Sequence, residues 1–123
     1  MIKVKRAYEE ATEADGARIL VDRLWPRGLA TGSARIELWM KDLAPSHELR
    51  RWFGHSPERW QEFKARYRRE LIESGGTARL QELAQRAKSE TITLVFAAKD
   101  ETYNNAQALK ELIETIQANP DLS

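Results

Sequence analysis

The apolar and polar positions of the chain predict strands near both ends and helices between them. Residues 2–6 alternate between branched apolar and basic side chains, which predicts a short, half-exposed edge strand. Residues 17–22 form a more apolar run, and residues 91–98 form a nearly continuous one, which is typical of strands buried on both faces. Because the connection over residues 8–16 is too short for a crossover helix, we expect the first two strands to pair antiparallel.

Residues 38–43 fit two patterns. Their alternation of apolar and polar side chains favours a strand, whereas Ile36, Trp39 and Leu43 also recur at helical spacing. We interpret the segment as a strand because a turn, residues 44–46, closes it. A helix remains the alternative.

Four helices are predicted from their boundary signals. Residues 47–53 form a short helix that stops at Gly54. A hydroxyl cap, a proline and an acid at residues 56–58 start a longer helix with a strongly aromatic buried face. The last helix begins near Asn105 and is stopped by Asn119–Pro120, and a further helix starts at Thr77.

Helices that separate strands imply parallel neighbours and a sheet covered on both sides. The predicted fold class is therefore α/β: a small, mostly parallel sheet covered by helices on both faces, with an antiparallel N-terminal edge strand. At 123 residues the chain has the size of a single domain, residues 1–123.

Composition narrows the function classes. The sequence has no cysteine and only two histidines, which excludes thiolate catalysis, Cys-ligated metals and a His-rich metal site, and we predict no cofactor and no metal. Twenty basic residues against 19 acidic ones give a net charge of +1, which does not favour a nucleic-acid partner. The longest apolar run, residues 94–98, is too short to cross a bilayer, so we expect a cytoplasmic protein without membrane contact.

Polar side chains gather where the predicted strands end. In open α/β sheets, ligands bind outside the carboxyl ends of the strands, beside the amino ends of the following helices. The chain after each of three strand ends supplies candidates for ligand binding: Arg23, Trp25, Arg27, Lys41, Ser46, Lys99, Tyr103, Asn104 and Asn105, with Asp22 and Asp100 as candidate catalytic residues.

These residue types suit an anion. Arginine matches the geometry of carboxylate or phosphate, and the amino end of the last helix adds free N–H groups. Arg23, Arg27 and Lys99 would hold the anion. Asp22 or Asp100 would act as general acid or base, while Asn104 and Asn105 would orient the ligand. The sequence therefore predicts an enzyme or binding domain for an anionic small molecule that bears a phosphate or carboxylate group, a class that includes nucleotide-like ligands. Whether it catalyses a reaction stays open.

Other interpretations remain open. Asp22 and Arg23 could pair with Lys99 and Asp100 across adjacent strands and only fix the loops. An exposed Trp25 would instead indicate an interaction module for a protein or nucleic acid, and a scaffold or dimerisation unit is a third possibility. We interpret His47 and His55 as helix-end residues. The oligomeric state is not encoded in these patterns.

Several of these blocks carry a resemblance to a known family. Residues 21–28 (VDRLWPRG), 43–46 (LAPS), 52–55 (WFGH), 67–71 (YRREL) and 97–100 (AAKD) with Asn104–Asn105 resemble the YeaO-like family of small bacterial proteins, a domain of unknown function (488). The resemblance runs over essentially the whole chain. It implies a compact α/β domain and carries over no activity, substrate or catalytic residue.

Overall fold

The computed structural model describes residues 1–119, and its centre is a four-stranded sheet in which all paired strands are parallel. The strand order is β1-β4-β2-β3. The five residues of β4 are all buried, as expected for a strand with neighbours on both sides and cover on both faces. The strands are β1 (Ile2–Arg6), β2 (Ala17–Leu20), β3 (Leu38–Trp39) and β4 (Ile92–Phe96).

The predicted antiparallel pairing of the first two strands is wrong. β4 lies between β1 and β2 and runs parallel to both, with Ile92 opposite Ile2 on one side and Ala17 on the other. The connection, residues 7–16, contains only a 3₁₀ turn, η1 (Glu13–Asp15). An extended chain covers about 3.3 Å per residue, so such a connection can return along a short strand without a helix. The connection between β1 and β2 leaves room for one strand between them. That strand, β4, comes from a segment far along the chain.

The segment interpreted as a strand over residues 38–43 is only partly one. Leu38 and Trp39 form β3, and a 3₁₀ turn, η2 (Lys41–Leu43), follows. Met40 and Leu43 are buried on the way to the next helix. The helical spacing and the strand alternation seen in the sequence therefore each describe part of this segment.

The helices begin and end close to the predicted residues. The Ser46 hydroxyl accepts a hydrogen bond from the Leu49 N–H (3.1 Å), and the Asn104 side chain accepts one from the Gln107 N–H (2.8 Å). Pro120, part of the predicted stop signal, lies outside the described residues. No helix within residues 1–119 has the length and apolarity that crossing a bilayer requires. The helices are α1 (Thr31–Ala34), α2 (His47–Phe53), α3 (Trp60–Glu73), α4 (Thr77–Arg86) and α5 (Asn105–Ala118), and a 3₁₀ turn, η3 (Pro57–Arg59), precedes α3.

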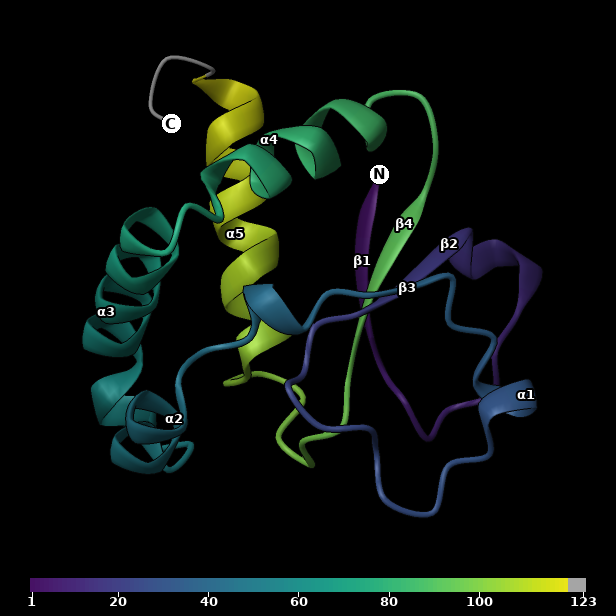
Figure 1. Ribbon diagram of the computed structural model, residues 1–123, viewed down its shortest axis with the longest axis horizontal. Coiled ribbons are helices and arrows are strands. Elements are labelled where there is room, and N and C mark those ends of the chain that lie inside the picture. The colour runs from purple at the N-terminus through teal and green to yellow at the C-terminus, as the bar shows by residue number, and fades with distance from the viewer. Residues whose placement is uncertain (120–123) are drawn as a thin grey trace.

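The two faces of the sheet are covered unequally (Figure 1). Helices α2 to α5 lie on one side, where Ile19 and Leu94 of the sheet share a core with Phe63 and Leu109. On the other side, a small cluster around Leu20 is covered by loops and by the four-residue α1. The prediction of helices on both faces is therefore confirmed for the face that α2 to α5 cover. The other face is covered mostly by irregular chain.

A buried ion pair lies on this loop-covered face. An Arg18 N–H donates to the Asp15 carboxylate (2.8 Å), and the Lys5 ammonium approaches the same carboxylate (3.1 Å). A second Arg18 N–H donates to the Ala34 carbonyl (2.8 Å). Burial acts to raise the pKa of Asp15, but hydrogen bonds from Thr12, Lys5 and Arg18 outweigh it and lower the pKa to about 2. The cluster ties β1 and β2 to the loops that cover them.

Candidate functional site

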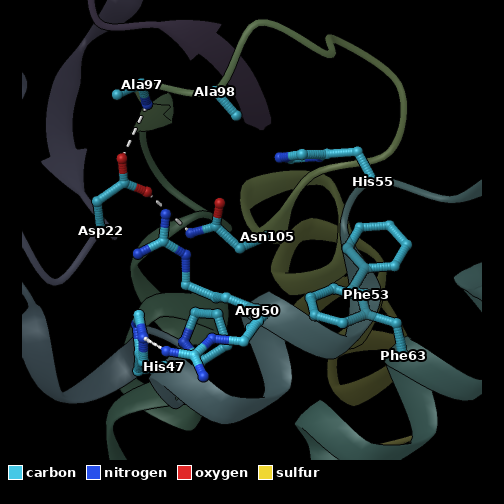
Figure 2. Close-up of a pocket in the computed structure, with 11 residues that line it drawn as sticks. Asp22, His47, Arg50, Phe53, His55, Phe63, Ala97, Ala98 and Asn105 are labelled. Atoms are coloured by element: carbon cyan, nitrogen blue, oxygen red, sulfur yellow. Dashed lines mark hydrogen bonds between the residues drawn. The ribbon is translucent and has the colours of Figure 1, made fainter.

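A pocket of about 480 Å³ opens where β2 and β4 end, between α2 and the amino end of α5 (Figure 2). The place agrees with the general rule that open α/β sheets bind ligands at the carboxyl ends of their strands. Phe53 and Phe63 form part of its apolar wall, together with Pro45, Ala97 and Ala98. Its polar lining consists of Asp22, His47, Arg50, Arg51, His55 and Asn105.

Asp22 joins the elements that form the pocket. Its carboxylate accepts hydrogen bonds from the Ala97 N–H (2.8 Å) and from the Asn105 amide (3.0 Å). Burial raises the pKa of the Asp22 carboxyl, although these two bonds and the charge of Arg50 act in the opposite direction. The indole of Trp39 donates to the Asp22 backbone carbonyl (2.7 Å). The residue thereby links the end of β2 to β3, β4 and α5.

A basic wall faces Asp22 from α2. His47, Arg50 and Arg51 stand three and four residues apart, so they share one side of the helix. Arg51 approaches the His47 Nε2 atom at 2.7 Å, and because a guanidinium only donates, the proton of a neutral His47 lies on Nδ1. Figure 2 shows the Arg50 guanidinium pointing toward Asp22 and Asn105. Within residues 1–119 it makes no hydrogen bond or ion pair.

His55 closes the pocket opposite this wall. Gly54 (φ 52°) and His55 (φ 55°) both adopt the left-handed conformation, which is uncommon for a residue other than glycine. The His55 Nδ1 atom lies 2.7 Å from the Tyr103 carbonyl, an acceptor only, so Nδ1 carries a proton and Nε2 is left for another partner. The turn thus aims the ring across the pocket toward Ala98 and Asn105 (Figure 2).

Of the residues predicted from the sequence, Asp22 and Asn105 line this pocket. Asp100 lies outside its lining, where the carboxylate accepts hydrogen bonds from the N–H groups of Thr102 (2.9 Å) and Tyr103 (2.8 Å). Asn104 is buried and caps α5. Ser46 caps α2 and binds the Glu70 carboxylate through its N–H and hydroxyl (2.9 and 2.5 Å).

Other predicted residues lie outside the pocket lining. Arg23 donates to the Ala44 carbonyl (3.3 Å), and the half-buried Trp25 donates to the Leu29 carbonyl (2.8 Å). Arg27 is exposed. Of the remaining three, Lys41 lies over the Trp39 ring (4.0 Å), Tyr103 packs edge-on against Trp60 (5.5 Å), and Lys99 is exposed. The alternative ion pairs of Asp22 and Arg23 with Lys99 and Asp100 do not form among residues 1–119.

The basic residues of α2 and its following turn were missed as pocket residues. The sequence contained one usable signal, because residues 47, 50 and 51 share a helix side just after the turn that closes the third strand. Nothing local indicated that this side faces Asp22. Within residues 1–119, no group of three or more His, Asp or Glu side chains is arranged to hold a metal ion.

Sequence comparison identifies the family. The profile described as the inactive DUF488-N3 subclade matches residues 1–121. The chain belongs to this family. An uncharacterized protein of Mycobacterium tuberculosis is 41% identical over 112 residues, which cover 91% of this chain and 92% of the relative. The uncharacterized protein YeaO of Escherichia coli is 36% identical over 115 residues, covering 94% and 98%. No solved structure matches the chain.

Membership of the DUF488-N3 subclade confirms the resemblance inferred from the sequence blocks. The family description contains the word inactive, and the relatives named above are uncharacterized proteins. No residue role can therefore be transferred from them.

Proposed function

We propose that this DUF488-N3 protein binds an anionic small molecule, bearing a phosphate or carboxylate group, in the pocket between α2 and α5, and does not transform it. One observation carries the proposal. The Arg50 guanidinium faces the pocket, and within residues 1–119 none of its N–H groups has a hydrogen-bond partner. A planar fork of free donors matches two oxygens of a phosphate or carboxylate.

The surrounding charges favour an anion. Arg51 lines the same pocket as Arg50, so two guanidinium groups stand against the single carboxylate of Asp22. Both Asp22 oxygens already accept hydrogen bonds, which leaves the arginine fork available to a ligand. The volume of about 480 Å³ suits a small metabolite, because small-molecule sites commonly measure about 300–1,000 Å³. A nucleotide-like ligand falls within this class.

Binding without turnover is the simpler role. The family is described as inactive, and Asp22 holds strand ends together through its hydrogen bonds. Catalytic roles for Asp22 and Asp100 stay predictions from the sequence.

A second candidate is an interaction module for a protein or nucleic acid. Leu24, Leu38 and Trp39 are exposed apolar side chains at or near the β3 edge, which favours a contact surface there. Trp25, on which the sequence argument for this role depended, is half-buried and hydrogen-bonded to Leu29. The pocket therefore has the stronger support.

A thermal-shift screen tests the proposal. Wild type, Arg50→Ala and the control Arg68→Ala, an exposed arginine outside the pocket, would be mixed with nucleoside monophosphates, sugar phosphates, citrate and inorganic phosphate. A ligand at a hundred times its Kd adds about 2.7 kcal/mol, which is several degrees for a domain of this size. We expect a shift in wild type and Arg68→Ala that Arg50→Ala loses. Equal shifts in all three proteins would reject the pocket.

A further inference from the structure

The side-chain amide of Asn105 is held in one orientation. Its nitrogen donates to the Val21 carbonyl (3.0 Å) and to the Asp22 carboxylate (3.0 Å). The Val21 carbonyl can only accept, so an amide rotated by 180° would place two oxygens against each other. The amide nitrogen must therefore face the end of β2, and the amide oxygen must face away from it.

That oxygen points into the pocket. Figure 2 shows it on the side of Asn105 that faces Ala98 and His55, and it accepts no hydrogen bond within residues 1–119. Asn105 is the first residue of α5, and the adjacent Asn104 and Ala106 are fully buried, which fixes the backbone that carries the amide. The pocket therefore presents a fixed acceptor beside a basic wall.

We propose that the pocket selects anions that also carry a hydroxyl or N–H donor a short distance from the charged group. The anionic group would lie on the Arg50 guanidinium, and the donor would bind the Asn105 amide oxygen. Hydroxylated phosphate monoesters, such as sugar phosphates and nucleotides, meet both requirements. Inorganic phosphate and simple alkyl phosphates meet only the first. This inference rests on the proposed function and narrows its ligand class.

The selectivity follows from the cost of an unpaired polar group. A ligand that reaches Arg50 but has no donor would displace water from the Asn105 oxygen without replacing its hydrogen bond. We expect a preference of roughly tenfold for the donor-bearing ligand.

Calorimetric titration with matched probes tests this. Glycerol 3-phosphate and n-propyl phosphate have the same charge and a similar length, and differ in two hydroxyl groups. Wild type should bind glycerol 3-phosphate roughly tenfold more tightly, and Asn105→Ala should reduce the ratio of the two affinities to about one. The ratio is informative even if the variant binds both probes more weakly.

A third probe tests the need for a donor with the wild-type protein alone, so that the result does not depend on the folding of Asn105→Ala. Glycerol 3-phosphate with both hydroxyls methylated keeps its oxygens and loses its donors, so wild type should treat it like propyl phosphate. Equal binding of all three probes by wild type, or an unchanged preference in folded Asn105→Ala, would overturn the inference and leave anion binding intact. Binding of none of the three would reject both the inference and the proposed function.

Discussion

Arg18 and Arg50 each lie near an aspartate, and the two arginines are placed for different purposes. Arg18 and Asp15 are both buried on the loop-covered face and contact each other at 2.8 Å. Arg50 is exposed to the pocket and faces Asp22 without bonding to it. The first arginine neutralises a carboxylate that holds loops against the sheet, whereas the second keeps its donors free.

The pKa shifts of the two aspartates run in opposite directions. Hydrogen bonds from Thr12, Lys5 and Arg18 overcome the burial of Asp15 and lower its pKa to about 2, whereas burial dominates at Asp22 and raises its pKa. A carboxylate that is stabilised by direct ion pairs, as Asp15 is, has a structural role. A carboxylate that is desolvated beside an unbonded arginine marks a place where a ligand can enter.

The largest expected loss of stability comes from breaking the buried ion pair between Asp15 and Arg18. Asp15→Asn leaves Arg18 buried without its counter-charge, which should lower the free energy of unfolding by about 3–5 kcal/mol. Urea unfolding followed by tryptophan fluorescence measures the change. Glu62→Gln, which removes an exposed ion pair with Arg66, is the control and should cost less than about 1 kcal/mol. Similar losses in the two variants would contradict a structural role for the buried pair.

Acid should remove part of this stabilisation in the wild type. Because the pKa of Asp15 is lowered from 3.8 to about 2, its stabilisation is present above pH 4 and is lost as the pH falls toward 2. The loss should be about 2 kcal/mol, and Asp15→Asn should lack this part of the pH dependence. Asp22 contributes with the opposite sign, since a raised pKa favours the folded state on acidification. Parallel stability profiles of the wild type and Asp15→Asn between pH 5 and 2 would exclude Asp15 as the source.

Removing the pocket carboxylate should have a smaller effect. Asp22→Ala leaves the Ala97 N–H and one Asn105 donor without their acceptor, at a cost of about 1–2 kcal/mol, because the open pocket admits water to both groups. The same urea experiment measures it. If Asp22→Ala lowered the free energy of unfolding as much as Asp15→Asn, Asp22 would have the same structural role as Asp15.

The smallest change in stability is expected on substitution of Arg50. Arg50→Ala removes no hydrogen bond present within residues 1–119, so stability should change by no more than about 0.5 kcal/mol. A decrease of more than about 2 kcal/mol in the free energy of unfolding, measured with urea, would show that Arg50 has a structural role. It would also remove the main support for an anion site.

Local signals in the sequence predicted the helices well, but the predicted pairing of the first two strands was wrong. Ser46, the Ser56–Pro57 pair and the glycine after Phe53 mark helix boundaries through contacts within a few residues, so they can be recognised without the fold. The pairing of β1 depends on β4, which lies far along the chain, and no local spacing reveals it.

The candidate site divides in the same way. Asp22 and Asn105 could be predicted because each stands where an apolar run meets polar residues. Arg50 and His55 reach the same pocket only through the packing of α2 and the left-handed turn after it. Arg27, which was predicted as a ligand-binding residue, lies outside that pocket.

The contrast between Arg50 and Arg27 can be used to test whether the anion site lies between α2 and α5. We would measure the affinity of glycerol 3-phosphate for wild type, Arg50→Ala and Arg27→Ala by calorimetry. We predict a loss of at least tenfold in Arg50→Ala, the factor that corresponds to about 1.4 kcal/mol, and wild-type affinity in Arg27→Ala. Loss of binding in Arg27→Ala with wild-type affinity in Arg50→Ala would contradict this prediction and place the site on the loop after β2.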